Sequence, residues 1–91
     1  MAKQVAPEDP FVSSTLGWIL YKRGVYQRAL KLLREGAARL PDNAELQYHL
    51  GMAAARTGDK DLARKPLAFA AGSPAAFKGK DEARKALAGL K

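Results

Sequence analysis

Apolar residues recur along this chain at helical spacing in five successive segments, separated by glycine, proline or helix-capping residues. The first segment, Phe11 to about Lys22, is followed by Gly24, a residue typical of helix C-terminal turns. The later segments carry their apolar positions at Tyr26, Ala29, Leu30, Leu33 and Ala37; at Leu46, Leu50, Ala53 and Ala54; at Leu62, Ala63, Leu67 and Ala70; and at Ala83, Ala86, Leu87 and Leu90. No stretch alternates as a strand does, so the pattern predicts an all-α fold.

Local signals mark where these helices begin and end. Pro41-Asp42-Asn43 is expected to end the second helix and cap the third, while Gly58 closes the third and Asp59 caps the fourth. Gly72-Ser73-Pro74 predicts a loop. Asp81-Glu82 are expected to open the last helix, because acidic residues in a first turn complement the helix dipole.

Two parts of the chain repeat each other at a fixed distance. Leu16-Gly17, Gly24, Ala29 and Leu33 return in the same order and spacing as Leu50-Gly51, Gly58, Ala63 and Leu67. A constant period of about 34 residues indicates a helical hairpin that stacks on copies of itself. Such an architecture presents an extended surface and needs no catalytic pocket.

These residues resemble the tetratricopeptide repeat family, in which each unit is a pair of antiparallel helices, A and B. Gly17 and Gly51 match its small position in helix A, Ala29 and Ala63 its small position in helix B, Leu16, Leu20 and Leu33 its large core positions, and Pro41 its inter-repeat proline. The resemblance implies a right-handed stack of hairpins, with a glycine facing an alanine where the helix axes approach closely. It places one repeat at 10–43, a second at 44–77 and a capping helix at 78–91, with 1–9 as the tail of a preceding repeat or a disordered leader.

The pattern also departs from the family. Pro66 lies inside the expected second B helix, where proline removes a backbone hydrogen bond, so a kink or an early end is predicted there. Ala75 replaces the second inter-repeat proline, and Arg84 and Lys85 fall where leucine and glycine would be required. Because Pro7-Glu8-Asp9 extends the period backwards, we expect the C-terminal piece of a longer array, with an exposed first helix that invites a homodimer. A coincidental proline in a disordered leader is the alternative.

Composition narrows the function further. The 91 residues suit one domain, cysteine is absent, and no apolar run is long enough to span a membrane. The first ten residues lack the apolar core of a signal peptide, and the compartment stays unknown. A net charge of +7 favours acidic partners, although a solvated basic surface is the ordinary interpretation.

Few residues could carry chemistry. His49, with Glu45 four residues before it, could form an acid–base pair only beside a nucleophile, and none is visible. No phosphate-binding glycine loop and no metal-ligand set appear. The sequence therefore predicts neither an enzyme nor a cofactor.

The family's concave groove supplies the binding hypothesis, that of a scaffold or adaptor which binds a peptide segment or a subunit on its A helices. The matching positions are Ser14, Trp18, Tyr21, Lys22, Glu45, Tyr48, His49, Met52 and Arg56, with Phe11 and Ala55 beside them. Trp18 and Tyr21 could instead pack between neighbouring A helices. Ser14 and Trp18 replace residues of the family's carboxylate clamp, so binding of a C-terminal tail through that clamp is not supported.

Basic residues offer the competing hypothesis of nucleic-acid or anionic-surface binding through the convex face. They are Arg28, Lys31, Arg34 and Arg39; Lys60, Arg64 and Lys65; and Lys80, Arg84 and Lys85. Glu35 and Asp61 interrupt this stripe and no aromatic residue interleaves it, so a nucleic-acid partner is not expected.

Overall fold

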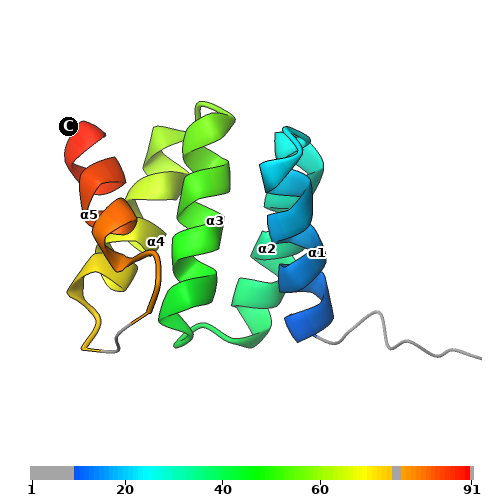
Figure 1. Ribbon diagram of the computed structural model, residues 1–91, viewed down its shortest axis with the longest axis horizontal. Coiled ribbons are helices and arrows are strands. Elements are labelled where there is room, and N and C mark those ends of the chain that lie inside the picture. Colours follow the sequence, from blue (N-terminus) through cyan, green and yellow to red (C-terminus); the bar gives the residue numbers. More distant parts are fainter. Residues whose placement is uncertain (1–9, 75–76, 91) are drawn as a thin grey trace, which may run out of the picture.

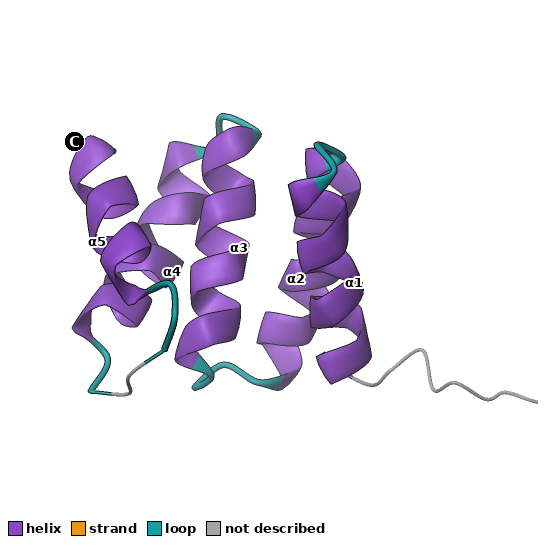
Figure 2. Ribbon diagram, in the orientation of Figure 1, coloured by secondary structure: helices purple, strands orange, loops and turns teal. Residues whose placement is uncertain are grey.

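The computed structural model describes residues 10–74 and 77–90, and this part of the chain contains five helices and no strand (Figures 1 and 2). The helices are α1 (Pro10–Lys22), α2 (Tyr26–Arg39), α3 (Ala44–Arg56), α4 (Lys60–Gly72) and α5 (Lys80–Gly89). The predicted all-α fold is thus confirmed. The predictions that concern Pro7-Glu8-Asp9 and Ala75 lie outside the described residues.

The helices pack in sequence order as two hairpins followed by a single helix. Helix α1 packs against α2 and α3 against α4, while α2 contacts α3 and α4 contacts α5. The odd-numbered helices also contact one another, α1 with α3 and α3 with α5. In Figure 1 the α1–α2 pair therefore forms one end of the stack and α5 the other.

Both hairpin turns use the same backbone geometry at equivalent positions of the repeat. Gly24 and Gly58 have φ angles of 86° and 87°, a left-handed backbone conformation that residues other than glycine rarely adopt. The amide of Val25 donates to the carbonyl of Leu20 at 2.9 Å, and that of Asp59 donates to Ala54 at 3.0 Å. These bonds satisfy carbonyls that each helix end would otherwise leave unpaired.

Side-chain caps fix the starts of α3 and α4 as the sequence predicts. The Asn43 carboxamide oxygen accepts from the Leu46 amide, and the Asp59 carboxylate accepts from the Leu62 amide, both at 3.0 Å. Each cap satisfies one of the amide groups left free at a helix N-terminus. Helix α5 has Asp81 and Glu82 in its first turn, as expected.

Each hairpin closes where a glycine of the first helix meets a leucine of the second. A Cβ atom added to Gly17 would lie 2.8 Å from the Leu33 Cγ, and one added to Gly51 would lie 2.5 Å from the Leu67 Cγ. Both leucines are fully buried. The glycine was expected to face the family's small alanine. For Gly17 the Ala29 carbonyl oxygen is also close, at 3.2 Å, but the main neighbour is a leucine side chain in both hairpins.

This close contact predicts that one methyl group added to the glycine will destabilise the protein. Replacing Gly51 by alanine should lower the free energy of unfolding by about 1–3 kcal/mol, because an overpacked core outweighs alanine's better helix propensity. Urea unfolding followed by circular dichroism measures the difference. Gly89 is the matched control, because a Cβ there meets nothing within 4 Å. Equal stability of the Gly51→Ala and Gly89→Ala proteins would contradict the close approach.

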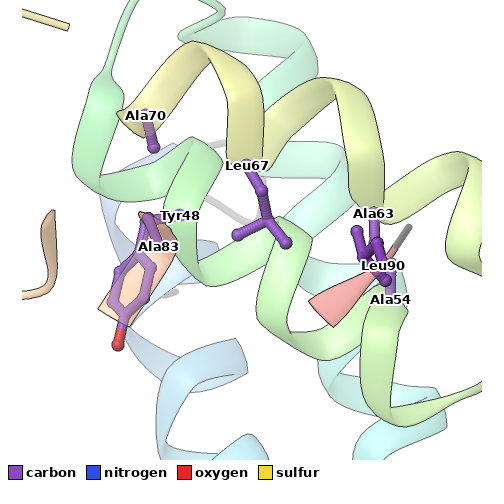
Figure 3. Close-up of a cluster of buried hydrophobic side chains, with 7 residues drawn as sticks. All are labelled: Tyr48, Ala54, Ala63, Leu67, Ala70, Ala83 and Leu90. Atoms are coloured by element: carbon purple, nitrogen blue, oxygen red, sulfur yellow. The ribbon is translucent and has the colours of Figure 1, made fainter. Parts of the chain in front are cut away.

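The buried side chains form two clusters. The first lies between α2 and α3 and contains Ala29, Leu33, Ala37, Leu46, Leu50 and Ala53. The second joins α3, α4 and α5 and contains Tyr48, Ala54, Ala63, Leu67, Ala70, Ala83 and Leu90. Figure 3 shows the second cluster, with Leu67 pointing from α4 towards α3. Alanine accounts for three of the six residues in the first cluster and four of the seven in the second, so the helices pack closely with little room for larger side chains.

Leu16 does not occupy the core position that the repeat pattern gives it. Its side chain is 46% exposed, whereas its counterpart Leu50 is 6% exposed. Leu50 belongs to the cluster between α2 and α3. None of the described helices covers the corresponding face of α1, so Leu16 matches a core position of the family by sequence but is exposed in this structure.

Pro66 does not end the fourth helix. Helix α4 continues through Pro66 to Gly72, and the proline itself is buried beside Leu67. The proline's fixed φ angle is compatible with a helix, and burial of its ring offsets part of the lost hydrogen bond to the Leu62 carbonyl. Of the two predicted outcomes, the early end is therefore wrong, and the kink stays a prediction.

The missing hydrogen bond can still be tested by substitution. Pro66→Leu restores a backbone amide opposite the Leu62 carbonyl, and the new side chain faces an open apolar groove lined in part by Pro41, Leu62 and Phe69. We expect the free energy of unfolding to rise by about 1–3 kcal/mol, since proline costs about 3 kcal/mol inside a helix. Thermal unfolding measures the change. A lower melting temperature would mean that ring packing outweighs the restored bond.

Candidate functional site

The candidate residues named from the sequence lie on α1 and α3, two helices in direct contact. Helix α1 carries Ser14, Trp18, Tyr21 and Lys22, and α3 carries Glu45, Tyr48, His49, Met52 and Arg56. Spacings of three and four residues place each set along one side of its helix.

Trp18 is the centre of this face. Its ring stacks on His49 of the next hairpin, with 3.9 Å between centroids and 13° between planes. It also stacks on Tyr21 of its own helix at 4.5 Å and 6°. Trp18 is half-buried, so it packs between the two helices and still presents part of its ring. The packing of Trp18 between neighbouring A helices is thus observed, whereas a groove role for the exposed part of its ring stays a prediction.

A pocket of about 300 Å³ opens beside this stack, between α1 and the first two turns of α3. Its lining includes four of the predicted residues, and the full set is Phe11, Ser14, Thr15, Trp18, Ile19, Asn43, Glu45, Leu46 and His49. The Ser14 hydroxyl donates to the Phe11 carbonyl at 3.2 Å, which holds that side chain against its own helix. The pocket thus has an aromatic wall and one exposed carboxylate, that of Glu45.

Two exposed cations lie towards the other end of the same face. The Arg56 Nε donates to the Tyr21 hydroxyl at 3.4 Å, and its guanidinium carbon lies 5.9 Å from the Tyr26 ring centroid. The Lys22 ammonium lies 5.9 Å from the Trp18 ring centroid. Cation–π contacts of this kind hold the charges in place while leaving them accessible to a partner.

Tyr48 does not belong to the open face. It is 8% exposed, its ring lies 5.8 Å from that of Phe77, and a Cβ on Gly79 would collide with it. Burial raises the pKa of its hydroxyl. The expected role of Tyr48 as a groove anchor is corrected to a packing role, because the segment before α5 covers its ring. Met52 is half-buried and also packs against this second cluster.

His49 is neutral in this setting. Burial lowers its pKa from 6.5 to about 4, and the positive charge of Lys22 acts in the same direction. A neutral imidazole stacked on Trp18 acts as a flat packing surface. Within residues 10–74 and 77–90, no group of three or more histidine, aspartate or glutamate side chains could hold a metal ion.

The lowered pKa makes stability depend on pH. As pH falls from 6.5 to 4 the unfolded chain binds a proton at residue 49 before the folded chain does. The contribution of His49 is complete above 6.5 and is lost across this window, by at most about 3 kcal/mol. Urea titrations at a series of pH values measure the slope. His49→Gln should remove it; equal slopes in both proteins would contradict the burial of this imidazole.

Sequence reasoning missed two aromatic residues next to this site. Tyr26 opens α2, yet its ring lies 5.4 Å from Tyr21 because the Gly24 turn folds the chain back. The short separation of these two tyrosines across that turn was the available signal. Phe77 lies in the loop before α5 and packs on Tyr48, and no periodicity marked it.

The basic residues of the competing hypothesis lie on α2, α4 and α5, and nearly all are exposed. Two arginines among them are ion-paired one turn away on their own helix. Arg64 pairs with Asp61 at 3.1 Å and Arg84 with Asp81 at 3.6 Å. Exposed pairs of this type are weak but lower the charge available to a polyanion.

Comparison with known proteins finds a relative at the sequence level. A 50-residue stretch is 38% identical to a "TPR repeat-containing protein" of Pseudomonas aeruginosa, and it covers 55% of this chain and 8% of that protein. No family model matches the chain. No solved structure matches it either. No described helix has the length and apolar character needed to cross a membrane.

Proposed function

We propose that the chain is a tetratricopeptide-like protein-binding module whose partner lies against α1 and α3. The partner is a peptide segment or a subunit surface, and the module acts as a scaffold or adaptor. The proposal rests on one arrangement: an aromatic stack between two hairpins, with a pocket at one end and two held cations towards the other.

The pocket supplies a place for an apolar side chain. It is walled by Trp18 and His49, and neutral His49 brings no charge that an apolar group would have to displace. Partly exposed tryptophan and tyrosine rings are the residues that most often dominate the energy of a protein interface. A leucine or aromatic side chain of the partner fits this chemistry.

The two cations give one end of the site a positive charge. Lys22 and Arg56 are exposed, and Arg56 is fixed by the Tyr21 hydroxyl. A carboxylate of the partner would pair with them, and the net charge of +7 favours an acidic segment over a basic one. Glu45 at the pocket end sets the opposite preference there. The site therefore favours a segment that carries an apolar anchor and, some residues away in either chain direction, acidic residues.

Selection from a random peptide library tests this proposal. Peptides displayed on phage are selected on the full chain, and the affinities of enriched sequences are measured by calorimetry. We expect these sequences to share an apolar residue with acidic residues at a constant distance on one side of it. The double variant Lys22→Glu, Arg56→Glu should weaken binding by roughly 10- to 100-fold, because each pair in a partly desolvated interface contributes about 1 kcal/mol or more.

A matched charge reversal on the opposite side of the hairpin is the control. Lys31→Glu, Arg34→Glu changes net charge by the same amount on the exposed side of α2. It should leave peptide affinity within about twofold at roughly 0.15 M salt, where distant charges are screened. Equal losses in both double variants would contradict the α1–α3 face and favour binding through the basic residues of α2, α4 and α5.

A further inference from the structure

Helix α1 has a second exposed face that shares only Ile19 with the pocket of the proposed binding site. Val12, Leu16 and Ile19 are spaced by four and three residues, so they share one side of the helix. These side chains are 44%, 46% and 47% exposed. We call them the outer face of α1. The stretch 11–21 contains no charged residue, which is unusual for a helix with an open side.

The chain contains a covered version of this face one repeat later. Val12, Leu16 and Ile19 correspond to Leu46, Leu50 and Ala53 of α3, which are only 3%, 6% and 0% exposed. These three share a buried cluster with Leu33 and Ala37 of α2, and Leu30 and Leu40 pack at its edge. The sequence of α2 therefore shows which side chains pack against such a face.

A second covered version lies further along the chain, on α5 and its C-cap residue Leu90. Ala83, Leu87 and Leu90 repeat the spacing of the α3 residues, and Ala83 and Leu90 are buried in the cluster with α4. Helix α4 thus covers α5 as α2 covers α3. Three successive odd-numbered helices present the same face, and only that of α1 is open among the described residues.

We propose that the outer face of α1 is a docking site for an amphipathic helix that packs on it as α2 packs on α3. The occupant carries leucine and alanine at the spacing of Leu30, Leu33, Ala37 and Leu40, and no charge on that stripe. This proposal continues the α2–α3 interface by one step and concerns a different side of α1 from Trp18.

A second copy of this chain is a poorer occupant. Within one copy α3 already covers the apolar face of α2, and α5 covers that of α4. Among the described residues, a second copy could therefore offer its own α1 or the groove around Leu62, Pro66 and Phe69, and neither is a free leucine–alanine stripe like that of α2. Three aliphatic side chains on a helix roughly 20 Å long form a patch well below the ~800 Å² per partner of a stable dimer.

A tandem protein tests the proposal. A copy of residues 10–43 is placed directly before Pro10 of the full chain, which keeps the repeat register and lays the added second helix against α1. We expect amide hydrogen exchange in the original α1 to slow by at least about tenfold, and binding of a hydrophobic dye to fall. Unchanged exchange in α1 would overturn the proposal.

Substitution of Leu16 shows whether the protection comes from this face. In the original chain Leu16→Glu should shift the melting temperature by less than about 2 °C, and in the tandem it should lower it by more than about 5 °C. Leu50→Glu is the control for a covered position and should be severe in both. Similar small shifts for Leu16→Glu in both proteins would overturn the proposal.

Two further measurements test the proposal if the tandem protein does not fold or if the chain forms a dimer. If the tandem fails to fold, a synthetic peptide of residues 26–40 is titrated to millimolar concentration while methyl NMR signals are followed. Shifts at Val12, Leu16 and Ile19 support the proposal, and their absence overturns it. Sedimentation of the original chain distinguishes the other occupant, since a dimer that Leu16→Glu dissociates would overturn docking of a separate helix.

Discussion

The close approach of a glycine in one helix to a leucine in the next holds each hairpin of this structure. Gly17 meets Leu33, and Gly51 meets Leu67, with no room for a single added methyl group. Both leucines are fully buried, so each contact also anchors one of the two core clusters. Because the turn glycines and the capping bonds recur at the same period, both hairpins close in the same way.

The candidate site depends on that repetition. With equal hairpins, equivalent residues of α1 and α3 fall side by side, and Trp18 meets His49 across the boundary. The stack is therefore a product of two hairpins and exists in neither alone. Its energetic weight is modest, since an aromatic pair contributes about 0.5–1.5 kcal/mol beyond the area it buries. Its value lies in fixing a flat apolar wall beside the pocket and beneath the Lys22 ammonium.

Local signals made most of the fold predictable. Gly24, Gly58, Asn43 and Asp59 act through hydrogen bonds or φ angles within a few residues, and the helix ends they predicted are those observed. The approximate placement of the candidate residues on α1 and α3 followed from periodicity in the same way. The burial of a side chain by residues far away in the sequence could not be predicted from local signals. Tyr48 is buried because Phe77 and Gly79 return over it, and that loop breaks the repeat register.

The same limit explains α5. Counted at the constant period of the two hairpins, Arg84 and Lys85 occupy positions that require leucine and glycine, so the last helix looked unrelated to the repeats. A small shift in the preceding loop restores the pattern and aligns Leu87 with Leu50. Changing the length of a loop costs little free energy, since doubling it costs about 0.6 kcal/mol. A repeat can therefore lose its constant length in residues and still present the same apolar face of each helix for packing.

Helix α1 contributes to both proposed binding surfaces and also packs against the rest of the structure. One side carries Gly17 against α2, a second carries Trp18 against α3, and a third carries the outer face of Val12, Leu16 and Ile19. A helix contacted on two sides of three has fewer buried apolar contacts than α3, and local stability follows such contacts. A helix docked on the outer face would therefore hold α1 more firmly and reduce the motion of Trp18 and of the pocket wall. If both surfaces are used, docking on one side of α1 would couple to binding on another through the order of a single helix, with no change of shape required.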